Sequence, residues 1–312
     1  MRNARSYRSR RGAALMVVLW LIAVLAMASI TALRVIAFDM SIAASTIHGA
    51  RASHLAEMGV SIGAHPQIKR TDPLLRYAGE DENEGYEVRL TSEGERFNIN
   101  AIVSGRDVDL LNNMFTEWGM ELEESEALVD ALTDWIDADD DAALNGAEFD
   151  AYEEVGRFNQ PFNRPFYSLD EVRLVFGMDR LEALQPRWRD WFTVWSSGQL
   201  DINDASAEHI AMAAECPIEQ ALLVTEAIDG ADGIRNTEDD ERFNDVGSAL
   251  ALLGIDPTLD PLLAKRFSVN DSTTRIESTG WVGEARRRIT VIVRNRSGSK
   301  PLLLKRTQEI LP

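Results

Sequence analysis

The sequence predicts an α+β fold in which a long N-terminal helix packs on a small antiparallel sheet and a large all-α domain is inserted between the strands of that sheet. Three observations predict it. An apolar segment near the N-terminus continues into a helical pattern, alternating segments typical of strands occur before residue 100 and after residue 265, and helical spacing fills the stretch between them. A sheet built from both ends of the chain is the simplest fold that satisfies all three.

The first element is a membrane-spanning segment at residues 12–33. No charged residue lies between Arg11 and Arg34, and about 20 apolar residues, at about 1.5 Å rise each, cross the hydrocarbon core once. Five arginines precede this segment, and positive charge beside a span stays in the cytoplasm. We therefore expect a single-pass inner-membrane protein with its C-terminal domain in the periplasm.

The junction between the basic leader and the span allows two kinds of processing. A secretory signal peptide would be cut after a small-x-small motif, for which the candidate is Ala26-Met27-Ala28. A short Arg-rich leader ending in Gly12, followed directly by the span, instead resembles the prepilin-peptidase signal of type IV pilins and type II secretion pseudopilins. That resemblance implies that prepilin peptidase removes residues 1–12 and methylates Ala13, which takes the net charge from −19 to −24.

The helical pattern continues beyond the membrane to about Ala64, with apolar and charged residues interleaved as in an amphipathic helix. Pro66 ends it, because proline and the residue before it disfavour helical backbone. We assign residues 13–65 to this helix, which looks like the first helix of a pilin.

Segments typical of strands flank the middle of the chain. Residues 85–91 alternate in polarity, and we assign residues 66–98 to the first part of a pilin-like sheet domain. Residues 266–312 are expected to complete the sheet. Their candidate strands are 267–269, 274–279, 288–294 and 302–304.

Residues 99–265 are predicted to form the helical insert. Apolar residues recur at helical spacing in 108–118, 123–136, 169–176, 205–214 and 218–228. Asp201–Ile210 resembles the opening of a helix-hairpin-helix repeat, so we expect a helix-hairpin-helix or SAM-like domain. Its acidic surroundings and the net charge of −19 argue against nucleic-acid binding. One buried helical face is expected to carry Trp188, Trp191 and Trp195.

Residues 121–156 contain 14 acidic side chains and no lysine or arginine. Calcium, which takes 6–8 oxygen ligands, would turn the repulsion between such carboxylates into attraction. Compared with an EF-hand loop, Asp137, Asp139 and Asp141 fall at positions 1, 3 and 5, and Glu148 at position 12. Ala142 stands where the EF-hand has glycine, so a solvated acidic loop remains the alternative. For residues 229–240, where Gly repeatedly follows Asp, a cation site and a polar turn are left equally open.

Several segments together resemble the K-type minor pseudopilin family of type II secretion systems. They are the leader junction, the Asp-rich motif, residues 163–172 and residues 201–210. Val17 fits as well, because this subunit type lacks the Glu that other pseudopilins carry at the fifth mature position. The resemblance implies a subunit at the tip of the pseudopilus of a Gram-negative bacterium, which takes part in protein export across the outer membrane.

The same resemblance implies a calcium site and a set of partners. The calcium ligands would include Asp137, Asp139 and Glu148, whereas Asp150 is displaced by one residue from the place where the family often has its next Asp. The implied partners are I-, J- and H-type minor pseudopilins, the major pseudopilin and prepilin peptidase. A minor pilin of a type IV pilus is the first alternative, and a membrane-anchored periplasmic hydrolase is a distant one.

No enzymatic activity is expected. The four histidines show no zinc-binding spacing, and the sequence has no Gly-x-Ser-x-Gly motif or phosphate-binding loop. Cys216 is the sole cysteine, so the chain has no intrachain disulfide.

Overall fold

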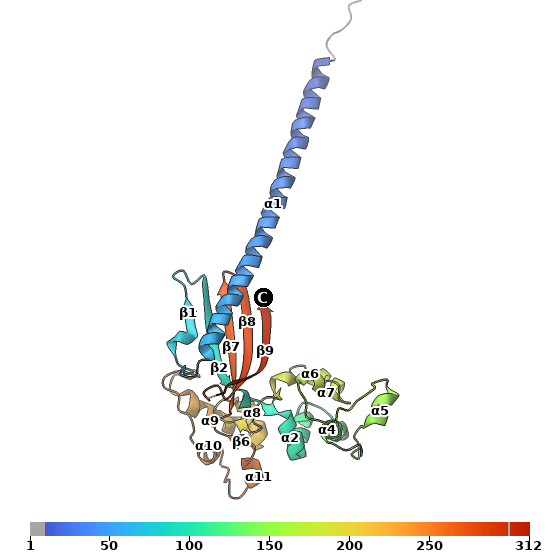
Figure 1. Ribbon diagram of the computed structural model, residues 1–312, viewed down its shortest axis with the longest axis vertical. Coiled ribbons are helices and arrows are strands. Elements are labelled where there is room, and N and C mark those ends of the chain that lie inside the picture. The colour runs from blue at the N-terminus through green and yellow to red at the C-terminus, as the bar shows by residue number, and fades with distance from the viewer. Residues whose placement is uncertain (1–9, 299) are drawn as a thin grey trace, which may run out of the picture.

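The computed structural model describes residues 10–298 and 300–312. It shows a long helix whose C-terminal part lies on an antiparallel sheet, and a helical insert beyond the end of that sheet (Figure 1). The predicted fold class is confirmed. Most of the predicted leader, residues 1–9, lies outside the described residues.

Helix α1 runs from Arg10 to Gly63. It contains an exposed window with a mean hydropathy of 2.5 and, within the described residues, is the one helix long and apolar enough to cross a membrane. Its last carbonyl groups have no partner within the helix. Arg296 donates hydrogen bonds to the carbonyl oxygens of Gly63 and His65, both at 2.9 Å, and so fixes the point where the helix ends before Pro66.

The main sheet has five antiparallel strands in the order β1-β2-β7-β8-β9. Their bounds are β1 Arg76–Ala78, β2 Glu84–Ser92, β7 Thr273–Val282, β8 Ala285–Arg294 and β9 Leu302–Leu311. The last strand is longer than the predicted 302–304, because it pairs along β8 up to Leu311. The long connection between β2 and β7 holds the entire insert.

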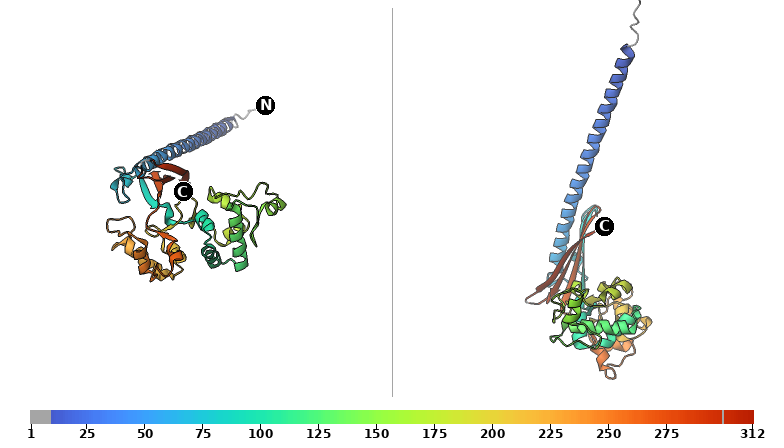
Figure 2. Two further views of the ribbon diagram at one scale, coloured as in Figure 1. Left: turned by 60° about the horizontal axis from the view of Figure 1, so that its bottom comes forward. Right: turned by 90° about the vertical axis from the view of Figure 1, so that its right-hand side faces the viewer.

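One face of the sheet packs on the C-terminal part of α1, which lies along it in profile (Figure 2). Ala52 and Leu55 of α1 share an apolar core with Val88 and Ile276 of the sheet. The approach is closest at Gly280, where an added Cβ would overlap the backbone of Ala52 and Ala56. A glycine is required there because no side chain fits between helix and strand.

The insert consists of short helices, which gather in two groups, α2–α7 and α8–α11 (Figure 2). Their bounds are α2 Ile99–Gly105, α3 Val108–Glu117, α4 Leu122–Ile136, α5 Phe149–Glu154, α6 Leu169–Val172, α7 Met178–Leu184, α8 Ala207–Ala214, α9 Ile218–Asp229, α10 Val246–Leu252 and α11 Pro261–Ala264. Helix α6 ends earlier than the predicted residue 176, because the chain continues in tight i→i−3 turns towards Gly177, whose φ is +86°.

The insert also contains two short parallel pairings that the helical patterns did not predict. Strand β3 (Phe97–Asn98) pairs with β4 (Phe192–Thr193), and β5 (Leu200–Asp201) pairs with β6 (Phe267–Ser268). The predicted strand 267–269 therefore belongs to the insert and not to the main sheet. Each pair brings segments that are far apart in the sequence together at the base of the insert.

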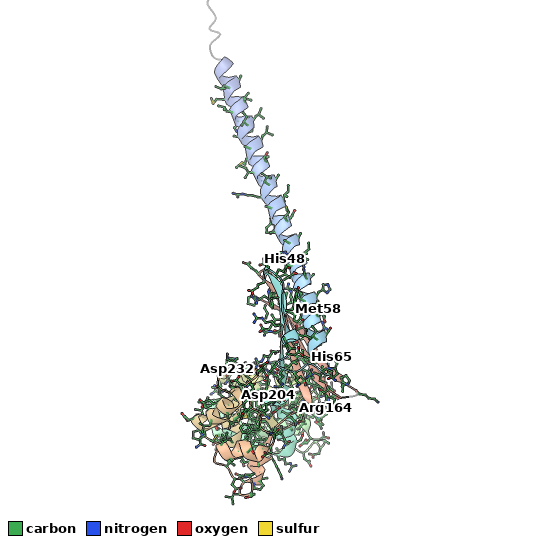
Figure 3. All side chains as sticks on the ribbon, turned by 90° about the vertical axis from the view of Figure 1, so that its left-hand side faces the viewer. His48, Met58, His65, Arg164, Asp204 and Asp232 are labelled. Carbon is green, nitrogen blue, oxygen red and sulfur yellow. The ribbon has the colours of Figure 1, made fainter. Side chains whose placement is uncertain are left out.

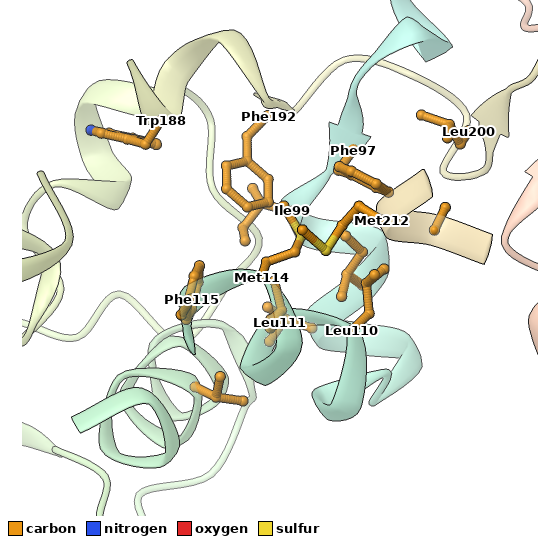
Figure 4. Close-up of a cluster of buried hydrophobic side chains, with 14 of the residues drawn as sticks. Phe97, Ile99, Leu110, Leu111, Met114, Phe115, Trp188, Phe192, Leu200 and Met212 are labelled. Carbon is orange, nitrogen blue, oxygen red and sulfur yellow. The ribbon is translucent and has the colours of Figure 1, made fainter. Parts of the chain in front are cut away.

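The predicted helix face carrying three tryptophans is wrong. Trp188 opens a 3-10 turn that spans Trp188–Asp190, and Trp195 follows strand β4, because Phe192 and Thr193 pair with β3. Trp188 is nevertheless fully buried in the apolar core of the insert, close to Phe192 (Figure 4). The ring of Trp191 stacks on His209, with ring centroids 4.5 Å apart.

Candidate metal site

The acidic segment predicted to bind calcium forms the connection between α4 and α5. Helix α4 ends at Ile136 and α5 begins at Phe149, so the intervening loop has twelve residues, Asp137 to Glu148. We call these residues the acidic loop. The first and last positions of the EF-hand comparison thus coincide with the ends of a loop between two helices.

Two carboxylates on α4 hold the acidic loop in place. Asp134 is buried, and its two oxygens accept hydrogen bonds from the backbone N–H of Ala143 at 3.1 and 3.2 Å. Asp130, one turn earlier, accepts from the backbone N–H of Asn145 at 3.0 Å. Gly146 lies so close to Asp134 that an added Cβ would overlap its carboxylate. The last turns of α4 therefore determine the path of the loop.

Several buried oxygens at the acidic loop have no hydrogen-bond partner among the described residues. They include one carboxylate oxygen of Asp137, both carboxylate oxygens of Glu148 and the amide oxygen of Asn163. Asn163 uses its amide nitrogen to donate to the backbone oxygen of Asp139 at 3.0 Å. Buried carboxylate oxygens without donors are costly to ionise, and a bound cation would offset this cost.

Burial and neighbouring negative charges raise the pKa values of two carboxyl groups at the loop. Burial, together with the negative charges of Asp134 and Asp137, raises the pKa of Glu148 to about 7. Burial also raises the pKa of Asp137, and the neighbouring Asp139 raises it further. A bound cation would reverse both effects, because it favours the ionised carboxylates.

The acidic loop supplies the oxygen atoms that a hard cation prefers, but its carboxylates do not form a preassembled cluster. No three His, Cys, Asp or Glu side chains in the described part of the chain lie close enough together to hold a metal ion. Glu148, Asp150 and Asn163 line one cavity of about 650 Å³ beside the loop. Asp139 and Asp141 are exposed, and the N–H of Asp141 donates to the Asp139 carboxylate at 3.2 Å. An ion here would use Asp137, Glu148 and amide or backbone oxygens.

Asp134 and Asn163 contribute to this site but were not predicted from the sequence. Asp134 and Asp137 lie three residues apart, so the helical spacing of acids on α4 could have indicated that they act together. Asn163 lies in a different segment, and no local pattern connects it to the loop. Its contact with Asp139 depends on the path of the chain between α5 and α6.

In the second acidic segment, residues 229–240, donors from the same segment bind the Asp229 and Asp239 carboxylates. Asp239 accepts from the backbone N–H groups of Ala231 and Asp232 at 2.8 and 3.1 Å, and Asp229 pairs with Arg235 at 2.6 Å. Of the two interpretations left open by the sequence, these contacts favour the polar turn.

The predicted processing site lies at the start of α1. Gly12 and Ala13 are part of that helix, which continues without interruption into the apolar segment. Val17, the fifth residue after the predicted cleavage point, is exposed on it.

Comparison with known families assigns the central part of the chain. The family model described as type II secretion system (T2SS), protein K, matches residues 95–195. Residues 95–195, which we call the protein K domain, are therefore similar to this family. This region contains α2 to α7, the acidic loop and Asn163, so the predicted resemblance is confirmed for the part of the insert that holds the candidate metal site.

Two curated relatives bear the name type II secretion system protein K. The chain is 31% identical over 94 residues to the protein from Pectobacterium carotovorum subsp. carotovorum and 35% identical over 85 residues to the one from Dickeya chrysanthemi. Each alignment covers 27% of this chain, and it covers 29% and 22% of the two relatives. The matched part thus spans less than a third of either relative.

The fold is similar to one found in a crystal structure of the GspK-GspI-GspJ complex from the type 2 secretion system of enterotoxigenic Escherichia coli. The TM-score is 0.58 with 18% sequence identity, and the match covers 87% of this chain and 98% of the other. The likeness therefore extends over the sheet and the insert, well beyond residues 95–195.

Proposed function

We propose that this chain is a minor pseudopilin that caps the tip of a type II secretion pseudopilus and takes part in protein export across the outer membrane. The observation that carries the proposal is the place of the insert. The protein K domain lies beyond the end of the sheet farthest from the N-terminal half of α1 (Figure 1). The role is structural and not enzymatic.

The insert is compatible with the end of a fibre and not with its shaft. Subunits in a pilus-like fibre are stacked along their long N-terminal helices, and each must leave room for the next one. Residues 93–272 extend past the sheet along that direction, where a stacked neighbour would lie. Val17 agrees with this placement, because it offers no carboxylate to the terminal amine of a subunit ahead.

The proposed partners are other minor pseudopilins, of the I, J and H types, and the major pseudopilin. The apolar side chains of α1 up to Ile47 are exposed, and helices in a membrane associate through close packing of such residues. The similar fold in a GspK-GspI-GspJ complex supports the I- and J-type partners.

We also propose that α1 is anchored in the inner membrane with the sheet and the insert in the periplasm, as the positive charge before the span suggests. Prepilin peptidase would cut after Gly12, and Ala13 would become the methylated N-terminus. N-terminal sequencing of the membrane-bound protein should then begin at Ala13. A start near residue 29 would instead support an ordinary signal peptide.

A calcium ion in the acidic loop completes the proposal. Asp137 and Glu148 would hold the ion together with Asn163, while Asp139, on the exposed part of the loop, stays a prediction as a ligand. The ion would supply the positive charge that the buried oxygens lack and would fix the distal part of the protein K domain. Asp141 and Asp150, which are exposed, stay predictions as ligands.

The tip position is tested by labelling and by deletion. Immunogold label against the insert should mark one end of each pseudopilus, and loss of the gene should change the length or number of fibres and impair secretion. Label spread evenly along the fibres would show that the chain is a shaft subunit. Fibres that retract and bind surfaces, with secretion intact, would favour a type IV pilus instead.

A further inference from the structure

The junction between the sheet and the insert contains a buried charged cluster. Asp204 lies at the base of the insert, where it meets the sheet, and its side chain is only 2% exposed (Figure 3). It accepts hydrogen bonds from the guanidinium of Arg70, which follows α1, and from the backbone N–H of Ser92 at the end of β2. Asp204 thus connects the insert to both the anchor helix segment and the sheet.

Asp204 also contacts an arginine of the insert itself. The guanidinium of Arg242, in the loop between α9 and α10, lies 3.3 and 3.5 Å from the Asp204 oxygens. These contacts are longer than the one from the second nitrogen of Arg70, at 2.7 Å. Both arginines keep Asp204 ionised, because they hold its pKa below the usual range against the opposing effect of burial. Asp204 is the fixed negative charge of the cluster.

Asp201, three residues earlier, is a second buried carboxyl in the same cluster. It is 1% exposed, its oxygen accepts from the backbone N–H of Asn203 at 3.2 Å, and no Lys or Arg nitrogen of the described residues lies within 4 Å of it. Burial and the charge of Asp204 raise its pKa to about 6, while the Ser92 hydroxyl and Arg242 oppose this increase. The arginines that could neutralise Asp201 are already bound to Asp204.

The segments around Asp201 add further charge of the same sign. Gly94 separates it from Asp271, because a Cβ on that glycine would lie 3.2 Å from the Asp201 Cβ and 3.0 Å from the Asp271 Cβ. The Asp271 carboxylate in turn accepts a hydrogen bond from the backbone N–H of Ser197 at 2.7 Å. Asp271 lies just before β7, where the chain returns from the insert to the sheet. The charged groups near Asp201 in the packed segments are Arg70, Asp204, Arg242 and Asp271, and Glu95 acts on the same Arg70.

We propose that this cluster is a proton-linked joint, in which a proton on Asp201 holds the insert firmly to the sheet and loss of that proton loosens the insert relative to α1. An ionised Asp201 competes with Asp204 for Arg242, whose contacts are the weaker ones, and draws water into the junction. The orientation of the insert then depends on the pH outside the inner membrane. This inference does not rest on the tip position, because it concerns the joint alone.

The experiment measures a distance across the joint in the full chain, purified in detergent. Nitroxide labels are placed on Lys305→Cys in β9 and Glu226→Cys in α9, which are both exposed positions, and Cys216→Ser removes the native thiol. Pulsed electron paramagnetic resonance then measures the distance between the two labels. At about pH 5 we expect a single narrow distance distribution, and at about pH 8 one at least twice as wide, with a midpoint near the pKa of Asp201. Identical distributions at both pH values would overturn the proposal.

Three variants assign the effect to this cluster. Asp201→Asn, which mimics the protonated carboxyl, should stay narrow at both pH values, and Arg242→Gln should be wide at both. Ser92→Ala removes a hydroxyl that favours the ionised form, so it should move the midpoint to higher pH. If Asp201→Asn broadens with pH as the wild type does, the proton is held elsewhere and the proposal fails. Should that variant not fold, as judged by circular dichroism, the direction of the Ser92→Ala shift decides.

Discussion

The anchor region, formed by α1 and the five-stranded sheet, buries almost only apolar and hydroxyl side chains, whereas the insert buries charge. Every buried acidic residue among the described ones lies in the connection between β2 and β7, residues 93–272, which holds the insert; these are Glu93, Asp134, Glu148, Glu171, Asp201 and Asp204. The two regions therefore respond to different perturbations. The stability of the anchor region depends on volume and close packing, and that of the insert on protons, cations and hydrogen-bond donors.

The difference follows from how each region is built. The sheet pairs ten-residue strands along their full length, so backbone hydrogen bonds and one apolar face stabilise it. The helices of the insert have four to fifteen residues, too few to be stable alone, and they depend on caps and on buried polar contacts. Asn98, Ser168 and Ser206 each accept a hydrogen bond from the first turn of the helix that follows them.

Removal of calcium should produce the largest difference between the two regions. A ligand at about 100 times its Kd stabilises the native state by about 2.7 kcal/mol, so a chelator should lower the melting temperature of the insert by several degrees and leave the sheet unchanged. Asp137→Ala combined with Asp139→Ala should abolish this response, measured by calorimetry. Asp239→Ala is the matched control, because this carboxylate is bound by donors within residues 229–240, and the variant should keep the response to chelator. A melting curve that is the same in calcium and in chelator would reduce the acidic loop to a solvated loop.

Gly280→Ala should test the close packing of the anchor region. Its Cβ would overlap the backbone of Ala52 and Ala56, so α1 must move away from the sheet, at a cost of about 1–3 kcal/mol. Gly105→Ala in α2, where a Cβ meets nothing within 4 Å, is the control and should be neutral or stabilise by up to about 1 kcal/mol. Chemical denaturation measures both. Equal effects of the two substitutions would contradict the tight contact between α1 and β7.

Acid should destabilise the insert through His209. Burial, together with the charge of Arg96, lowers the pKa of His209 from 6.5 to about 4, so the unfolded chain binds the proton more tightly than the native one. The contribution of this residue is complete above pH 6.5 and is lost as the pH falls towards about 4, by on the order of 2 kcal/mol. The pH dependence of the Asp201 contribution to stability has the opposite sign. Its pKa is raised, so the native state binds the proton more tightly than the unfolded chain, and this contribution is lost as the pH rises through about 6.

The effect of His209 is therefore measured as a difference between two proteins. The free energy of unfolding of the wild type minus that of His209→Phe, taken from pH 8 to pH 4, should decrease steadily below pH 6.5. A difference that does not change with pH would show that His209 keeps its ordinary pKa in the folded state.

The smallest effect is expected at the ion pair between Glu57 on α1 and Arg306 on β9. Both side chains are about 40% exposed, and hydrogen bonds from Arg306 lower the pKa of Glu57. Exposed pairs contribute about 0.2–1 kcal/mol, so a double-mutant cycle with Glu57→Gln and Arg306→Gln should give a coupling in that range, reduced by salt. A coupling well above it would mean that charge matters in the anchor region as it does in the insert.

Local patterns in the sequence were sufficient for most of the anchor region, although they missed β1 and gave only residues 302–304 of β9. The apolar run, Pro66 and the alternation in residues 85–91 and 288–294 depend on near neighbours, and α1, β2 and β8 form where these patterns occur. The pairings β3–β4 and β5–β6 involve only two residues in each strand, so they carry no period that could reveal them. The tryptophan segment was misassigned for the same reason, because a spacing of three or four residues does not exclude a turn followed by a strand.

The candidate sites divide in the same way. The spacing of acids in the sequence predicts Asp137 and Glu148 as calcium ligands, and the negative charge of the chain argues against a nucleic-acid interface. Only the tertiary structure decided which carboxylates are buried away from solvent. The sequence separation between Arg70 and Asp204 is 134 residues, and Asn163 reaches the acidic loop from another segment. Charge and periodicity are local properties of a chain, whereas burial and the supply of hydrogen-bond donors are set by segments that meet only when it folds.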